Sequence, residues 1–266
     1  MTDTPGQRSG ARAQALQAVE AASQGADGAQ PLREPTALRQ QRYQVPPGAT
    51  DLLLVRHGAS EAYLDGAPFN LVDGHGDPPL SPDGVEQAEL VSARLAVLGV
   101  DAIYVSTLRR TADTAAPLAR KLGLTPQVEP DLREVFLGEW EGGLLRKMVA
   151  SGHPVAQRMA AEQRWDVIPG AESLAALDLR VRAAIERIVA AHEGQRVVAV
   201  SHGGIIGHAL YLASACRPFA FLGAENASIS RLVIAEDRWI VRVFNDTAHL
   251  DGLAVLDAVV RAETSA

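Results

Sequence analysis

The sequence is short of cysteine and of long hydrophobic runs, and each shortage excludes a class of protein. The chain of 266 residues contains one cysteine, Cys216, which excludes an intramolecular disulfide and any metal site built from several cysteines. The longest mostly apolar run, residues 203–216, is too short to cross a bilayer. Residues 1–20 contain no hydrophobic segment of the kind that forms a secretory signal. We therefore expect a cytoplasmic protein with no membrane partner.

Lysine and net positive charge are also scarce. Lysine occurs only at Lys121 and Lys147, and the formal net charge is −7 at pH 7. A nucleic-acid partner is not expected, because no basic excess is available to neutralise phosphates. A small anion remains a compatible partner, since a few arginines in one pocket can oppose the overall sign. Arginine supplies nearly all of the positive charge, and its planar guanidinium group binds phosphate oxygens in pairs.

The composition is that of a globular protein with one atypical end. Hydrophobic residues make up 47% of the chain and charged residues 21%, and the length corresponds to one large domain or two small ones. Residues 1–50 are rich in Ala, Gln, Gly, Arg and Pro and have few large apolar residues. We predict that residues 1–50 form a flexible N-terminal extension and that residues 51–260 form the folded domain.

After residue 50, short apolar runs alternate with segments of helical periodicity. The apolar runs, which predict strands, cover residues 52–55, 102–105, 126–129 and 196–200. The periodic segments, which predict helices, cover residues 82–98, 109–122, 174–193 and 203–214. Two further runs, residues 230–235 and 239–244, predict an antiparallel hairpin. This order predicts an α/β fold, a three-layer α/β/α sandwich with a mainly parallel sheet and an antiparallel edge hairpin.

Three segments that carry reactive side chains follow predicted strands: Arg56-His57-Gly58, Ser106 to Arg110, and Ser201 to Gly204. In a parallel sheet the carboxyl ends of the strands meet at one edge. Such sheets bind ligands at this edge, where helix N-termini supply amide donors. Each histidine alone is more often a structural hydrogen-bonding residue. Together, two histidines and two arginines form an anion pocket that suits a phosphoryl group, because imidazole can attack phosphorus. Glu134 is the candidate proton donor to the leaving oxygen.

A series of motifs in one order resembles the histidine phosphatase superfamily, which includes the cofactor-dependent phosphoglycerate mutases. The motifs are Arg56-His57-Gly58-Ala59-Ser60-Glu61, Asp77 to Ser81 with Gly84, Gln87 and Ala88, Ser106 to Arg110 with Thr114-Ala115, Leu132 to Glu134 with Gly138 to Gly142, Gly170 to Ser173 with Arg180, and Val200 to Gly204. The resemblance spans about residues 51–250 and leaves the N-terminal segment outside.

The resemblance implies a role for each matching residue. His57 is the implied nucleophile, which becomes phosphohistidine. Arg56, Arg110 and His202 are implied to hold the phosphoryl group and to stabilise its charge in the transition state. Glu134 is implied to protonate the leaving group and then to activate water. No metal or other cofactor is expected, because arginines take the place of a magnesium clamp.

Other candidate residues lie around the expected pocket. Ser60, in the first motif, is a further candidate contact to the substrate phosphate. Possible residues of the substrate mouth are His75, Tyr63, Arg146 and Trp165. For His75 a turn-shaping role is equally compatible, for Arg146 a solvated position, and for Trp165 packing in the core. Residues 144–168 are expected to be a variable insertion that covers the substrate.

The sequence favours one reaction among several. The mutases carry an asparagine where this chain has Tyr63, and a segment similar to Phe-Thr-Gly-Trp where it has residues 68–74. These departures favour a phosphomonoester hydrolase that acts on a small phosphorylated metabolite. A mutase-type phosphotransferase is the alternative, and a non-catalytic phospho-ligand binding protein is the second alternative. The sequence predicts no oligomeric state.

Overall fold

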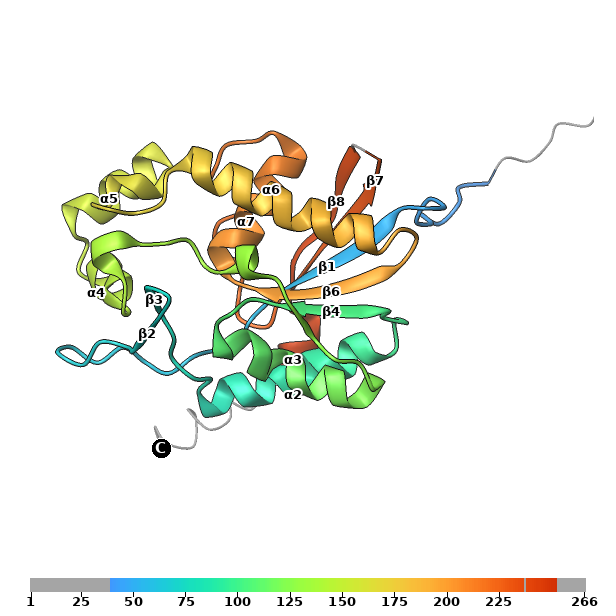
Figure 1. The fold of residues 1–266 in the computed structure, drawn as a ribbon, viewed down its shortest axis with the longest axis horizontal. Coiled ribbons are helices and arrows are strands. Elements are labelled where there is room, and N and C mark those ends of the chain that lie inside the picture. Colours follow the sequence, from blue (N-terminus) through green and yellow to red (C-terminus); the bar gives the residue numbers. More distant parts are fainter. Residues whose placement is uncertain (1–38, 237, 253–266) are drawn as a thin grey trace, which may run out of the picture. The chain divides into compact units, whose positions relative to one another are not determined.

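The computed structural model describes residues 39–236 and 238–252 (Figure 1). The chain divides into two compact units, residues 1–44 and 45–266. Of the first unit only residues 39–44 are described, and they contain no helix or strand. The predicted flexible extension at residues 1–50 falls mostly outside the described part and stays a prediction.

The second unit is built on a six-stranded sheet of order β5-β4-β6-β1-β7-β8. The strands are β1 (Thr50–Arg56), β4 (Ala102–Val105), β5 (Gln127–Val128), β6 (Arg196–Ser201), β7 (Ile229–Ala235) and β8 (Arg238–Asp246). Parallel pairing joins β1 to β6, β6 to β4, and β4 to β5, whereas β7 is antiparallel to both β1 and β8. The predicted mainly parallel sheet with an antiparallel edge hairpin is confirmed.

Helices cover both faces of this sheet, as Figure 1 shows. One face carries α2 (Pro82–Ala96) and α3 (Arg109–Leu122), and the other carries α6 (Leu174–Ala191) and α7 (Gly203–Ser214). The three-layer α/β/α sandwich is therefore confirmed. Among the described residues, no helix has both the length and the apolar character needed to span a membrane.

The remaining elements are short; all but η4, which follows β8, lie between the main helices and strands in the chain. They are β2 (Leu71–Val72), β3 (His75–Gly76), α4 (Leu144–Ala150), α5 (Pro154–Glu162), and the 3-10 turns η1 (Pro130–Leu132), η2 (Gly138–Trp140), η3 (Trp165–Val167) and η4 (Ala248–Leu250). The strands β2 and β3 form a separate antiparallel pair. The predicted insertion at residues 144–168 consists of α4, α5 and η3.

The central strands are apolar on both faces because each face packs on a helical layer. In β1, Leu52 and Leu54 belong to the cluster shared with α6 and α7. Leu53 and Val55 belong to the cluster shared with α2 and α3. Successive side chains of a strand point to opposite faces, so one continuous apolar run contributes to two cores. Burial on both faces fixes how the strands align with one another, and so the position of their ends at one edge of the sheet.

The start of α2 packs backbone to backbone against the loop that follows β1. A methyl group added at Gly84 would overlap the Ala59 carbonyl, and one added at Gly58 would overlap the Gly84 carbonyl. The same contact includes hydrogen bonds from Ala59 N to Gln87 Oε1 at 2.8 Å and from Ser81 N to Ala59 O at 2.9 Å. The helix therefore holds the segment that carries His57 at the end of β1.

We expect Gly84→Ala to destabilise the fold by about 1–3 kcal/mol, because the added methyl group overpacks a rigid backbone contact. The free energy of unfolding in urea measures this. Gly252→Ala is the control, since no described residue lies within 4 Å of the added methyl group there. Equal stability of the two variants would contradict the proposed close packing.

Candidate active site

A pocket of about 220 Å³ opens at the carboxyl edge of the sheet. It brings together predicted site residues from distant parts of the chain, namely Arg56, His57, His75, Arg110, Glu134 and Arg146. The other lining residues include an acidic one and an apolar wall: Glu141, Phe69, Pro78, Val135, Leu137 and Leu145. The pocket thus has a basic, histidine-containing part beside an apolar part.

His57 follows β1 and has one ring nitrogen already engaged. Its side chain is 5% exposed, and its Nδ1 lies 2.7 Å from the Gly58 carbonyl oxygen. A carbonyl can only accept, so Nδ1 carries the proton and Nε2 keeps a free lone pair. The backbone is held by bonds from His57 N to Ser201 O at 3.0 Å and from Asn226 Nδ2 to His57 O at 2.9 Å. His57 therefore has the tautomer of a nitrogen nucleophile.

His202 lies behind the pocket lining in a directed chain of hydrogen bonds. It is 0% exposed, its Nδ1 lies 3.1 Å from Arg110 Nη2, and its Nε2 lies 2.9 Å from Ser106 Oγ. Guanidinium can only donate, so Nδ1 accepts and Nε2 donates to Ser106. Ser106 Oγ lies 3.1 Å from Thr111 Oγ1, whose own proton goes to Leu108 O at 2.8 Å. The Ser106 and Thr111 hydroxyls fix the His202 tautomer, a role that sequence reasoning did not assign.

Both histidines are held in the neutral form. Burial, followed by the charges of Arg110 and Arg56, holds the pKa of His57 well below 6.5. Burial and the charge of Arg110 act in the same direction on the pKa of His202. The two rings are neighbours, with centroids 5.1 Å apart. A neutral imidazole is the nucleophilic form, so the site is prepared for attack at neutral pH.

The two arginines present donors to the pocket from different elements. Arg56 Nη1 donates to Ala224 O at 2.6 Å, while its buried Nε has no hydrogen-bond partner within the described residues. Arg110, in the first turn of α3, is 7% exposed and donates from Nη1 to Gly76 O at 2.9 Å. Burial lowers the pKa of each guanidinium, and the Glu134 charge opposes this. Both guanidinium groups line the pocket, so an anion there would lie beside two positive charges.

Glu134 lines the same pocket. Its Oε1 accepts from Val135 N at 2.9 Å, and its Oε2 accepts from Gly204 N at 3.4 Å. Gly204 is in the first turn of α7, where the helix dipole favours a carboxylate. A methyl group at Gly204 would collide with this carboxylate. Glycine is therefore required at Gly204 for Glu134 to reach the pocket.

Two of the candidate mouth residues reach the pocket. His75, which is 8% exposed, lines it and packs edge-on against the Phe136 ring. Arg146 lines it from α4 and donates to Ser60 Oγ and to Glu61 O, both at 2.7 Å. The Ser60 hydroxyl thus accepts a hydrogen bond from Arg146. Ser60 is not among the residues that line the pocket.

The other two candidates lie elsewhere. Trp165 is a correction: it is 7% exposed, belongs to the core cluster with α6 and α7, and packs against the Phe219 ring at 5.0 Å between centroids. Its indole fills the space between η3 and the core, so it does not line the pocket. Tyr63 packs edge-on against Phe69, which does line the pocket. Tyr63 therefore supports the pocket wall.

Only the start of the insertion 144–168 approaches the pocket. Leu145 and Arg146 line it, whereas Arg158 and Arg164 form ion pairs with Glu162 on the surface. The lining glutamate that sequence reasoning missed, Glu141, accepts from Gly76 N and Leu137 N, each at 2.9 Å. Glu141 lies inside a motif noted above, but only the fold shows that it ties β3 to the Glu134 segment.

Comparison with known proteins gives consistent relatives. Residues 52–247 match the sequence profile of the histidine phosphatase superfamily (branch 1). Phosphoglycerate mutase-like protein 4 of Arabidopsis thaliana is 33% identical over 215 residues, covering 78% of this chain and 90% of that protein. The structure of a mycobacterial glucosyl-3-phosphoglycerate phosphatase matches with a TM-score of 0.63 at 29% identity, covering 75% of this chain and 100% of that chain. The structure of the alpha-ribazole phosphatase from Shigella flexneri matches with a TM-score of 0.60 at 26% identity, covering 74% of this chain and 96% of that chain.

We expect His57 and His202 to remain neutral at pH 6.5, where an ordinary imidazole is half protonated. A lowered pKa means that protonation requires a lower pH, so both rings should titrate only below this point. Nitrogen-15 NMR of the imidazoles measures it. Arg110→Met removes a charge that lowers both pKa values, so both should rise in that variant. Titration of either ring at or above pH 6.5 in the unmodified protein would contradict the assigned electrostatics.

Proposed function

The chain belongs to the histidine phosphatase superfamily, as its motifs predicted, and on this basis we propose that it hydrolyses phosphomonoesters of small metabolites through a phosphohistidine at His57. One observation carries the proposal. A buried, neutral imidazole with a free Nε2 lines one pocket together with the guanidinium groups of Arg56 and Arg110 and the carboxyl group of Glu134. One site thus contains a nucleophile, hydrogen-bond donors for a phosphate anion and a group that can carry a proton.

The first step transfers the phosphoryl group to the enzyme. Arg56 and Arg110 bind the phosphoryl oxygens, and the His57 Nε2 lone pair forms a bond to phosphorus as the bond to the ester oxygen breaks. The departing oxygen takes a proton from Glu134. His202 orients Arg110 by accepting its hydrogen bond; the direct phosphate contact that the family resemblance implies for His202 stays a prediction.

The second step returns the enzyme to its starting state. A water molecule enters where the alcohol has left, and Glu134, now a carboxylate, takes its proton. The water oxygen forms a bond to phosphorus as the bond to His57 Nε2 breaks, and inorganic phosphate leaves. Atoms and protons balance, because the proton given to the alcohol in the first step is recovered from water in the second.

The pocket supports a small substrate with a partly apolar group. Beside the basic part, its wall is formed by Phe69, Pro78, Leu137 and Leu145. The Arg146 guanidinium lies over the Phe69 ring, 5.2 Å from its centroid, at the side of this wall. Similar structures that are named as a glucosyl-3-phosphoglycerate phosphatase and an alpha-ribazole phosphatase support hydrolysis. Expected substrates therefore carry one phosphomonoester on a compact organic body.

Mutase-type transfer is the second candidate, because the Arabidopsis relative is named mutase-like. It shares the first step and differs in the acceptor of the phosphoryl group, which is a second hydroxyl instead of water. A turnover screen on a panel of phosphomonoesters, with isomerisation of 3-phosphoglycerate included, separates the two. Release of inorganic phosphate supports hydrolysis, isomerisation supports the mutase, and binding without either product supports the non-catalytic alternative.

His57→Ala should lower turnover of 4-nitrophenyl phosphate by at least ~10³-fold, because loss of a nucleophile costs this much or more. The second measurement is acid-labile phosphate trapped on the rapidly quenched protein. It should map to His57 by mass spectrometry and be missing in the variant. Trapped phosphate on another residue would overturn the assignment of the nucleophile.

Glu134→Gln should slow the phosphorylation step about 10²–10⁴-fold with benzyl phosphate, whose alkoxide leaving group needs a proton. The loss with 4-nitrophenyl phosphate should be much smaller, because nitrophenolate is a weak base. Rapid-quench kinetics of phosphoenzyme formation compares them. Glu139→Gln, an exposed residue of the same segment, is the control and should leave both rates unchanged. Equal losses with both substrates in Glu134→Gln would show that Glu134 is not the donor.

A further inference from the structure

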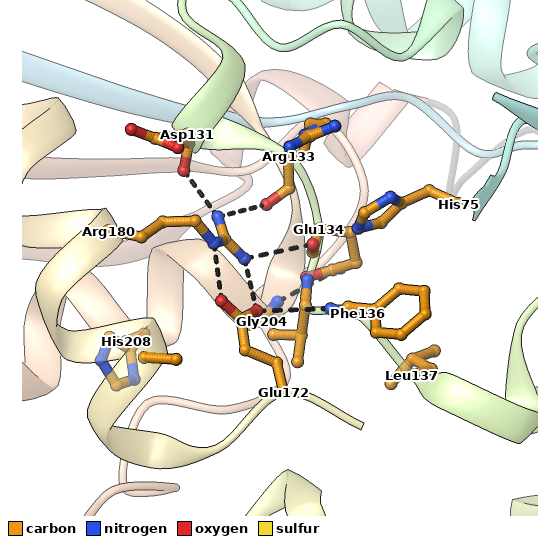
Figure 2. A network of polar contacts seen from close by, with 12 residues as sticks. His75, Asp131, Arg133, Glu134, Phe136, Leu137, Glu172, Arg180, Gly204 and His208 are labelled. Carbon is orange, nitrogen blue, oxygen red and sulfur yellow. Dashed lines mark hydrogen bonds and ion pairs between the residues drawn. The ribbon is translucent and has the colours of Figure 1, made fainter. Parts of the chain in front are cut away.

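The side chain of Arg180, in α6, is only 16% exposed. All of its N–H groups donate hydrogen bonds, either to Glu172 or to the backbone of residues 131–134. Its Nε and Nη2 donate to the two carboxylate oxygens of Glu172 at 2.8 and 2.7 Å. Its Nη1 donates to Asp131 O at 2.6 Å and to Arg133 O at 3.0 Å. Its Nη2 also donates to Glu134 O at 3.3 Å. Figure 2 shows the guanidinium between Glu172 and this backbone.

Glu172 holds the same segment on the far side of Glu134. Its Oε2 accepts from Phe136 N at 3.4 Å, and its own backbone N donates to Phe136 O at 2.9 Å. The Arg180–Glu172 pair therefore contacts the backbone before, at and after Glu134. In such a largely buried pair, hydrogen bonds between charged partners are shorter and stronger than those between neutral ones.

We propose that Arg180, oriented by Glu172, is a positioning residue that aims the Glu134 carboxylate at the leaving oxygen. The inference rests on the proposed function, because it assumes that Glu134 is the proton donor. It assigns to Arg180 and Glu172 no contact with the substrate: neither lines the pocket. Their effect passes through the backbone of residues 131–136.

The Glu134 side chain depends on this backbone because its own contacts are few. It accepts one bond from the adjacent Val135 N and one long bond of 3.4 Å from Gly204 N. No ion pair of the Glu134 carboxylate is recorded within the part of the chain that the structure describes. Its backbone also lies outside regular structure, between η1 and η2. A shift of the segment would move the carboxylate directly, and a misplacement of ~1 Å can cost ~10²-fold in rate.

Arg187 offers a matched control on the same helix. It lies two turns further along α6, is 50% exposed, and pairs with the side chains of Glu129 and Asp131. It therefore joins α6 to the same turn η1 through charge, without the bonds to the carbonyl groups at Arg133 and Glu134. Comparing the two arginines separates positioning of Glu134 from general attachment of this segment to the helix.

The test compares Arg180→Lys, Glu172→Gln and Arg187→Lys with the unmodified protein on benzyl phosphate and 4-nitrophenyl phosphate. Lysine keeps the charge but cannot make the two-pronged bond or reach all three carbonyls. The measured quantity is the ratio of kcat/KM for the two substrates, which reports the need for a proton donor. Thermal unfolding and phosphohistidine trapping are recorded for every variant.

We expect Arg180→Lys to lose about 10–100-fold more activity on benzyl phosphate than on 4-nitrophenyl phosphate, in line with a donor that is displaced but present. Glu172→Gln should shift the ratio in the same direction, and Arg187→Lys should leave it unchanged. A merely structural role would lower kcat/KM for both substrates by the same factor. If Arg180→Lys does not fold, the ratio for Glu172→Gln decides.

Folded variants of Arg180 and Glu172 with an unchanged ratio would overturn the positioning role. So would an equal change of the ratio in Arg187→Lys. Failure of the proposed function looks different, because the unmodified protein would then form no phosphohistidine with either substrate. That outcome would overturn the inference together with its premise, whereas trapped phosphohistidine with an unchanged ratio overturns the inference alone.

Discussion

The buried guanidinium of Arg110 is the group on which the rest of the site depends. It donates to Gly76 O and to His202 Nδ1, and lies 3.7 Å from Asp77 Oδ1. These contacts join α3 to the β2–β3 pair and to the residue before α7. Its charge also lowers the pKa of His57 and of His202 beyond the effect of burial. Burial and this charge together lower the pKa of both imidazoles, and the guanidinium also brings a positive charge to the pocket lining.

The parallel strands bring the basic side of the site together. Arg56 at the end of β1 is in register with Ser201 at the end of β6, and Val200 of β6 is in register with Val105 of β4. The residues that follow these strands must then meet at one edge. Because both faces of the sheet are covered, a shift of any of these strands would expose apolar side chains or bury polar ones. Core packing therefore sets the geometry of the side chains that line the pocket.

The acidic side of the site is held in a different way. Glu134 follows a 3-10 turn, and the carbonyl groups around it have no strand or helix to satisfy them. Arg180 supplies those bonds from α6, and α7 supplies the amide of Gly204. The basic half thus comes largely from strand ends and α3, and the segment of Glu134 is held by α6 and α7. Both halves line one pocket at the ends of the strands.

Sequence by itself determined the elements whose signals are local, and the motifs they carry. The strand at 102–105 and the helices at 109–122 and 203–214 have the predicted bounds, because apolar runs, caps and glycine stops act over a few residues. The left-handed Gly123 that ends α3 is such a stop. The motifs also indicated the residues that the sheet edge would gather.

Only the tertiary structure decided which side chains reach the pocket. Trp165 and Arg146 both lie in the segment 144–168, yet one packs in the core and the other faces the pocket. Arg180 meets the backbone of Glu134 across 46 positions of the chain. No local pattern encodes such contacts, because they depend on how two separate helical layers pack on one sheet. That packing, and no single motif, brings Glu134 and His57 to the same pocket.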